Sequence, residues 1–218
     1  MVHWIARTYF WLTERLYHEL AWFYDTASWL VSLGQWDTCR KYALDFLVGT
    51  EILEIGFGTG ELLLEMARRN IHVVGLDSSY DMHRITGKKL HNQGFDIPRI
   101  LGKVQQTPFA DSSFDTIIST FPAGYIFDHD TWCEAASLLR KNESLSHSFS
   151  SRFVVVGLFT IRTSKFHLPG TTSLLQHTYD DVLARIRTQA ESVGLDLRIE
   201  IRSFPGHDLP IIIAEKPR

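Results

Sequence analysis

From residue 51 onward, short apolar runs alternate with stretches in which apolar residues recur every three or four positions. The short runs predict buried strands, and the periodic stretches predict amphipathic helices. Regular alternation of the two indicates a doubly wound α/β sheet with helices on both faces. The predicted strands are 51–55, 72–77, 99–104, 114–120 and 153–159, and the predicted helices are 60–70, 82–93, 130–140 and 179–193.

The last part of the chain has a different pattern. Two apolar runs, 196–204 and 209–215, are separated by the short turn Pro205-Gly206-His207-Asp208, which predicts an antiparallel pair of strands. Two segments show no clear periodicity and are expected to be loops, the serine-rich 141–152 and 162–177 with its Pro-Gly pair.

Residues 1–46 differ from the rest because they hold five of the six tryptophans. Trp22, Trp29 and Trp36 are spaced seven apart, which places them near one face of a helix. We therefore expect an aromatic helical cap over 1–46 and a main domain over 47–218. The aromatic face either packs against the main domain, covers a hydrophobic substrate as a lid, or makes peripheral contact with a membrane interface. Few basic residues accompany it, which weakens the membrane alternative.

Composition narrows the functional class. The chain has 218 residues, a net charge of −3 and 44% hydrophobic residues, which fits a folded globular protein. No basic stripe is present, so nucleic acid is not an expected partner. Cys39 and Cys133 lack metal-ligand spacing, so neither a disulfide framework nor a metal site is expected. No apolar stretch is long enough to span a membrane and no cleavable leader is apparent, so we expect a cytoplasmic protein of undetermined oligomeric state.

A glycine-rich turn, Glu54-Ile55-Gly56-Phe57-Gly58-Thr59-Gly60, follows the first predicted strand and opens a helix. Such turns bind nucleotide cofactors because glycines let the backbone approach the ligand closely. A dinucleotide fingerprint needs its third glycine one position later, where this chain has Glu61. A carboxylate there would repel a pyrophosphate at the helix start. The spacing therefore disfavours NAD.

The pattern Glu54-x-Gly56-x-Gly58-x-Gly60 resembles the first motif of class I S-adenosylmethionine-dependent methyltransferases. The resemblance implies a Rossmann-like seven-stranded sheet, mostly parallel with an antiparallel C-terminal strand. It also implies S-adenosyl-L-methionine as cofactor and S-adenosyl-L-homocysteine as product. Glu54 is then expected near the cofactor's ammonium group. The full set of expected cofactor contacts is Glu54, Gly56, Phe57, Gly58, Gly60, Asp77, Ser78, Met82, Val104, Gln105, Thr120 and Tyr24.

Several positions have specific expected roles. Asp77 ends the second predicted strand, where an acid accepts ribose hydroxyls in nucleotide-binding folds. Met82 either packs on the adenine or fills the core. Lys103 replaces an acid that relatives commonly carry, so adenine recognition is expected to fall to the Val104 backbone and to Gln105 or Gln106.

The segment Tyr17-His18-Glu19-Leu20-Ala21-Trp22-Phe23-Tyr24-Asp25 is similar to a helical pattern of quinone-biosynthesis and bacterial phospholipid methyltransferases. That resemblance implies that Tyr24 closes over the cofactor and that the acceptor is apolar, planar or lipid-like. The run Ser119-Thr120-Phe121-Pro122 lacks the Asn-Pro-Pro-Tyr motif of amide-directed relatives, which argues against amide methylation. The expected acceptor contacts are Tyr17, Trp22, Trp29, Phe121 and Tyr125.

No catalytic base can be assigned from the pattern, and the candidates are His129, His167 and Tyr125. Methyl transfer from a sulfonium is a direct displacement, which depends more on in-line positioning than on acid or base. We therefore expect an enzyme that transfers methyl to O, C or N of a hydrophobic small molecule or lipid-like acceptor. The alternative is a non-catalytic sensor that binds S-adenosylmethionine, or a partner subunit that keeps the fold for assembly.

Overall fold

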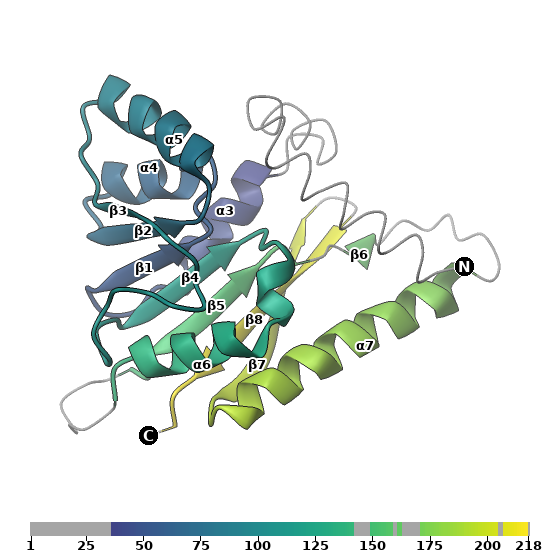
Figure 1. Cartoon of the computed structure of the whole chain (residues 1–218). Coiled ribbons are helices and arrows are strands. Elements are labelled where there is room, and N and C mark those ends of the chain that lie inside the picture. The colour runs from purple at the N-terminus through teal and green to yellow at the C-terminus, as the bar shows by residue number, and fades with distance from the viewer. Residues whose placement is uncertain (1–35, 142–148, 159–160, 163–170, 205–206, 218) are drawn as a thin grey trace.

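The computed structural model describes residues 36–141, 149–158, 161–162, 171–204 and 207–217. In this part of the chain, one twisted sheet has helices on both of its faces (Figure 1). The strands are β1 (Ile52–Ile55), β2 (Val73–Asp77), β3 (Arg99–Leu101), β4 (Thr116–Thr120), β5 (Arg152–Val156), β6 (Ile161–Arg162), β7 (Asp196–Phe204) and β8 (His207–Glu215). The helices are α3 (Trp36–Leu44), α4 (Glu61–Arg68), α5 (Tyr80–Asn92), the 3₁₀ helix η1 (Gly124–Phe127), α6 (His129–Leu138) and α7 (Thr171–Ser192).

The strand order is β3-β2-β1-β4-β5-β8-β6, and β7 pairs with the other edge of β8. Strands β1 to β5 are mutually parallel, whereas β8 runs antiparallel to β5, β6 and β7. The predicted Rossmann-like sheet with an antiparallel C-terminal strand is thereby confirmed. The predicted number of strands differs by one because the two-residue β6 pairs with the first two residues of β8, beyond the point where β5 ends.

Several predicted boundaries were wrong; β5, for example, ends at Val156 rather than at residue 159. Strand β3 ends at Leu101 rather than at residue 104, because the chain bends at Gly102 and enters a turn in which the N–H of Gln106 donates to the carbonyl of Lys103 at 3.3 Å. Helix α7 begins at Thr171, so the second half of the segment expected to be a loop is helical. The Pro169-Gly170 pair lies immediately before that helix in the sequence, so this turn signal falls at its boundary.

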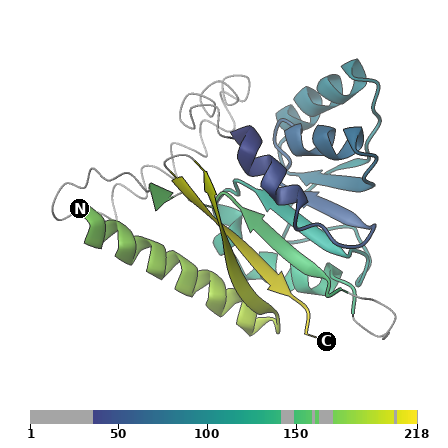
Figure 2. The ribbon, with the colours of Figure 1, turned by 180° about the vertical axis from the view of Figure 1, so that it is seen from behind.

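The central parallel strands β1, β2, β4 and β5 are largely buried on both faces, and the sheet separates two apolar cores. One core lies between the strands and α3, α4 and α5, and includes Ala43, Leu63, Met82, Ile118 and Val154. The other lies between the strands and α6 and α7, and includes Leu53, Ile117, Trp132, Phe153 and Ile186. Figure 2, which views the molecule from behind, shows α3 lying across the central strands. Burial on both faces explains why these strands read as continuous apolar runs.

The connection between α3 and β1 is fixed by a buried carboxylate at the start of β4. Asp115 is 3% exposed and accepts N–H bonds from Thr50 at 2.9 Å and Glu51 at 3.1 Å. Arg140 donates to the same carboxylate at 3.0 Å. Since these partners come from two segments far apart in the sequence, this carboxylate sets the register in which β1 enters the sheet.

The predicted aromatic cap falls mostly on residues 1–35, which lie outside the described residues. Its role and the division at residue 46 therefore stay predictions. The described part next to it, α3 and the following turn, contributes Ala43 and Phe46 to the same core as α4 and α5. Within the portion that the structure describes, no helix has the length and apolar character to span a bilayer.

We predict that Trp132→Ala lowers the free energy of unfolding by about 3–5 kcal/mol. The indole is fully buried, packs against Phe153 with ring centroids 5.1 Å apart, and donates its N–H to the carbonyl of Ile126 at 2.9 Å. Urea denaturation measures the change. Tyr80→Ala removes an aromatic side chain that is 70% exposed and should change stability by less than about 0.5 kcal/mol. Equal losses in the two variants would show that this core does not stabilise the domain as described.

Candidate functional site

Three connections meet at one edge of the sheet because parallel strands place their carboxyl ends together. The glycine-rich turn follows β1, the segment 78–79 follows β2, and the segment 121–123 follows β4. Strand β1 lies between β2 and β4 in the sheet, so the glycine-rich turn occupies the middle of this edge. In open α/β sheets this edge is where ligands bind.

The glycine-rich turn adopts a left-handed backbone at alternate residues, with φ of 67° at Gly56, 53° at Gly58 and 74° at Gly60. Side chains disfavour this conformation, which explains the spacing of the glycines. The turn is closed by the N–H of Gly60, which donates to the carbonyl of Phe57 at 2.9 Å. Gly60 is also the N-cap of α4, so the turn leads directly into a helix N-terminus.

Asp77, at the end of β2, holds the turn in place. One carboxylate oxygen accepts the N–H of Gly58 at 2.8 Å, and the other accepts the N–H of Ser79 at 2.8 Å. Ser79 in turn caps α5, because its hydroxyl accepts the N–H of Met82 at 3.3 Å. Asp77 is therefore part of the site's framework, and its expected contact with a ribose stays a prediction.

Glu54 lies on β1, two residues before Gly56, the first glycine of the turn. Its side chain is 1% exposed, and its Oε2 has no hydrogen-bond partner within the described part of the chain. Burial raises the pKa of Glu54 well above its ordinary value, the nearby charge of Asp77 raises it further, and Arg40 on α3 opposes both. A buried carboxylate without a partner for one oxygen is costly unless a ligand supplies that partner.

This arrangement fits the amino end of S-adenosylmethionine. An ammonium group beside Glu54 would supply the missing donor and the missing positive charge. The adjacent backbone has no side chains at Gly56, Gly58 and Gly60 to keep a ligand away. The residues present are therefore suited to this cofactor.

The remaining expected cofactor contacts differ in how accessible they are. Met82 is fully buried in the core, as one of its two expected roles requires, and Phe57 is 4% exposed and packs edge-on against His83. Gln105 donates to the carboxylate of Asp128 at 3.1 Å. Ser78 is exposed, Thr120 is half-buried at the end of β4, and Val104 is buried. All six stay predictions as cofactor contacts.

The expected acceptor residues Phe121 and Tyr125 lie just beyond β4. The hydroxyl of Tyr125 is 2.7 Å from that of Ser119 and donates to the carbonyl of Ile55 at 3.3 Å. It also lies against Gly56, where an added Cβ would be 2.4 Å from the tyrosine oxygen. The structure thus brings Tyr125 into contact with the glycine-rich turn, which lies far from it in the sequence. The sequence pattern did not predict this contact.

Several residues of the site were not anticipated. Ser119 is fully buried inside β4 and reads as an ordinary strand position, and Arg40 and Gly157 belong to segments without a recognisable motif. Gly157 has a positive φ in the structure, but a single glycine in the sequence does not reveal that its backbone adopts this conformation.

The histidine candidates have separate outcomes. His129 is exposed at the start of α6 and contacts Gln189 on α7 and Cys133, so its described contacts do not include the glycine-rich turn. His167 lies outside the described residues, as do Tyr17, Trp22, Tyr24 and Trp29. Their expected roles stay predictions.

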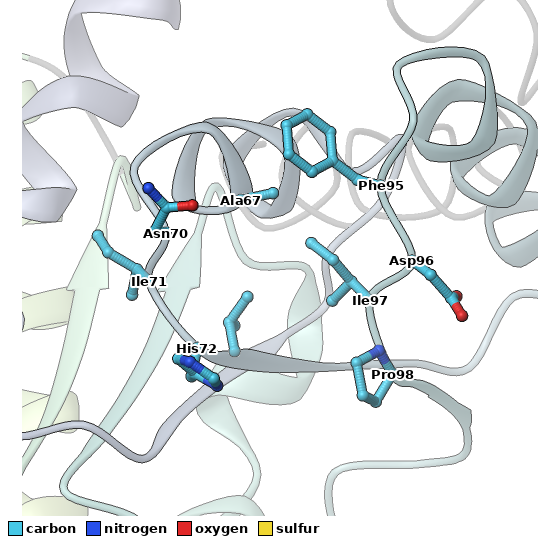
Figure 3. A pocket seen from close by; sticks show the side chains of 9 residues that line it. Ala67, Asn70, Ile71, His72, Phe95, Asp96, Ile97 and Pro98 are labelled. Atoms are coloured by element: carbon cyan, nitrogen blue, oxygen red, sulfur yellow. The ribbon is translucent and has the colours of Figure 1, made fainter.

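A pocket of about 250 Å³ lies at the opposite edge of the sheet, near the amino ends of β2 and β3 (Figure 3). Its position separates it from the glycine-rich turn, so it is not the cofactor site. Figure 3 shows Phe95 and Ile97 on one side and His72 and Ile71 on the other. The lining residues are Ala67, Asn70, Ile71, His72, Val73, Phe95, Asp96, Ile97 and Pro98.

The fold and the site together define an α/β domain with a glycine-rich turn at the carboxyl ends of its parallel strands. Comparison with known proteins gives the family. Residues 52–142 match the family described as "Methyltransferase domain", and this match covers β1 to β4, the glycine-rich turn and α6. Over these residues the chain is similar to the class I S-adenosylmethionine-dependent methyltransferases.

Individual relatives agree with this assignment. The chain is 33% identical over 119 residues to the demethylmenaquinone methyltransferase of Streptomyces avermitilis, covering 53% of this chain and 50% of that protein. It is 31% identical over 112 residues to the enzyme of that name from Thermotoga maritima, covering 49% and 47%. The chain thus spans about half the length of the curated relatives it matches.

Solved structures share the fold. The geranyl diphosphate C-methyltransferase of Streptomyces coelicolor, in complex with Mg²⁺, geranyl diphosphate and S-adenosyl-L-homocysteine, superposes with a TM-score of 0.61. The sequences are 12% identical, and the superposition covers 83% of this chain and 79% of that one. Fold alone does not set the acceptor.

We predict that Glu54→Gln stabilises the cofactor-free protein at neutral pH by about 1–2 kcal/mol while weakening cofactor binding by about 1–3 kcal/mol. The amide removes the cost of a buried charge, and it also removes the partner expected for the cofactor's ammonium group. Thermal unfolding and titration calorimetry with S-adenosyl-L-homocysteine measure the two effects.

The stability difference should depend on pH in a defined direction. Below the ordinary pKa of 4.5, folded and unfolded wild-type chains both hold the proton on Glu54 and the variants should be similar. As pH rises toward the raised folded pKa, the unfolded chain loses this proton first, so the wild type loses stability relative to Glu54→Gln. Glu61→Gln is the matched control, since Glu61 is partly exposed and paired with Lys89, and we expect it to change either quantity by less than about 1 kcal/mol. A less stable Glu54→Gln protein with normal affinity would contradict the role given to Glu54.

Proposed function

We propose that the protein transfers a methyl group from S-adenosyl-L-methionine to a hydrophobic small molecule or lipid-like acceptor. The observation that carries this proposal is the combination of a buried, incompletely paired Glu54 with an apolar, strained segment at the end of the neighbouring strand β4. When bound, the cofactor supplies an electrophilic methyl group on a sulfonium sulfur. Displacement at such a methyl needs a fixed approach line more than an acid or a base.

Glu54 and the glycine-rich turn act on the cofactor side. The turn is held by the chain's own hydrogen bonds, since the carboxylate of Asp77 accepts the N–H of Gly58 and the hydroxyl of Thr86 donates to the carbonyl of Gly58 at 2.8 Å. A site that is already ordered does not have to lose loop entropy on binding. In this proposal Glu54 fixes the amino end of the ligand, and the rest of the ligand extends along the carboxyl edge of the sheet.

Phe121 acts on the acceptor side. Its φ is +52°, an unusual conformation for a residue without a glycine's freedom, and it also precedes a proline, which favours extended backbone. Its N–H donates to the carbonyl of Val156 at 2.7 Å, which helps to hold the conformation. Backbone strain of this kind is concentrated at functional sites. This backbone conformation places the aromatic side chain of Phe121 at the junction of β4 and β5.

Gly157 receives the ring of Phe121. An added Cβ at Gly157 would lie 2.4 Å from two carbon atoms of that ring, so only glycine permits the contact. Gly157 itself has a φ of +76°. The end of β4 and the end of β5 are thus joined by an apolar surface, which favours an apolar acceptor over a charged one.

Tyr125 brings a polar group to the same region. Its hydroxyl is held by Ser119 and by the carbonyl of Ile55, beside Gly56. In the proposal this hydroxyl orients an oxygen, nitrogen or carbon nucleophile at the boundary between the cofactor and acceptor sides. The curated relatives named demethylmenaquinone methyltransferases support an acceptor with a large apolar part.

The proposal is tested by incubating the protein with S-adenosyl-L-methionine and a panel of quinols, phenols, prenyl compounds and phospholipids, and measuring S-adenosyl-L-homocysteine release. For an acceptor that is turned over, Phe121→Ala should raise the KM about tenfold or more, the scale of losing one buried aromatic contact, while cofactor affinity stays within about twofold. Phe95→Ala, at the opposite edge of the sheet, is the matched aromatic control and should leave both values unchanged.

The possible outcomes distinguish a methyltransferase from a non-catalytic sensor or partner subunit. Absence of cofactor binding by calorimetry would overturn the proposal entirely. Cofactor binding without turnover across the whole panel would instead favour a non-catalytic sensor or partner subunit. An equal rise in the KM of Phe121→Ala and Phe95→Ala would remove the acceptor role of Phe121.

A further inference from the structure

Cys133, His129 and Gln189 form a connected series of side chains on the surface where α6 meets α7. The Sγ of Cys133 lies 3.4 Å from Nε2 of His129, and Nδ1 of the same ring lies 2.8 Å from Oε1 of Gln189. Cys133 is exposed. The series therefore combines an accessible thiol, a base within reach of it, and a group that orients the base.

Two groups on α7 face Nδ1 of His129, Oε1 of Gln189 at 2.8 Å and the hydroxyl of Ser192 at 3.5 Å. In the tautomer that donates to Gln189, the nearer of the two, Nδ1 carries the proton. Nε2 is then the unprotonated nitrogen and can accept the proton of the Cys133 thiol. A nucleophile, a base and an orienting third group in this order are the arrangement that activates cysteine nucleophiles.

His129 is also restrained in its position. Asp128, directly before it, caps α6 by accepting the N–H of Asp130 at 3.2 Å. Because Cys133 lies four residues after His129 on the same helix, the two side chains share one helix face. Gln189 comes from the last part of α7, so packing of the two helices assembles the series.

We propose that Cys133 is a thiol-modification site that reacts with small disulfides, and that His129 is the base of this reaction. The thiol sulfur forms a bond to one sulfur of the disulfide as the disulfide bond breaks. The thiol proton passes to Nε2 of His129 and then to the departing thiolate, which leaves as a thiol. The products are a mixed disulfide on Cys133 and one equivalent of free thiol, so no further oxidant is required.

The test uses the full-length protein with Cys39→Ser, which leaves one cysteine, and the aromatic disulfide dithiobis(nitrobenzoate) as probe. We expect Cys133 to react at least about tenfold faster than in the additional variant His129→Ala, the low end of what a positioned base contributes. Gln189→Ala should give an intermediate rate, because the base is present but no longer oriented. Intact-mass measurement confirms a single mixed disulfide.

His91→Ala, which removes an exposed histidine on α5, is the matched control and should react like the parent protein. In urea all variants should react at one common rate, because the arrangement depends on the fold. If Cys39→Ser disturbs folding, peptide mapping of the wild-type protein distinguishes the two cysteines. Equal rates for the folded parent and His129→Ala, or a rate difference that persists in urea, would overturn the proposal.

Discussion

The interaction on which the site depends is the burial of the Glu54 carboxylate on the central strand β1, beside the glycine-rich turn. Burial and the charge of Asp77 both raise the pKa of Glu54, and Arg40 only partly opposes them. One of its oxygens lacks a partner in the described part of the chain. Such a group destabilises the free protein and is retained where a ligand completes it. The methyltransferase family that residues 52–142 match uses a cofactor whose amino end has the required charge and donors.

The other features of this edge keep Glu54 and its surroundings in position. Asp77 fixes the turn through Gly58, and Tyr125 packs on Gly56 while bound to Ser119. Beyond β4, the unusual backbone of Phe121 places its ring on Gly157. The proposed cofactor and acceptor sides are therefore built from adjacent strands of one sheet, and their relative position is set by the parallel register of β1, β4 and β5.

Local patterns predicted the parts of this structure that depend on local physics. Short-range sequence sets β1, the glycine-rich turn and α4, which follows it. It also sets the antiparallel pair β7 and β8 at the end of the described chain. Tertiary contacts were harder to anticipate. Nothing near Ser119 or Gly157 indicates that they meet Tyr125 and Phe121, and His129 gave no sign that its neighbours are Cys133 and Gln189. The segment 162–177 was interpreted as a loop, although α7 begins within it at Thr171.

The central claim is that the cofactor's positive charge completes the buried carboxylate of Glu54, and proton release on binding tests it most directly. Calorimetric titration with S-adenosyl-L-homocysteine is repeated in buffers that differ in ionisation enthalpy, at a pH between the ordinary and the raised pKa of Glu54. The account predicts that binding releases up to about one proton from the wild-type protein, because the ligand favours the ionised carboxylate, and that Glu54→Gln abolishes this release. Binding with no proton release, or an equal release by Glu54→Gln, would contradict it.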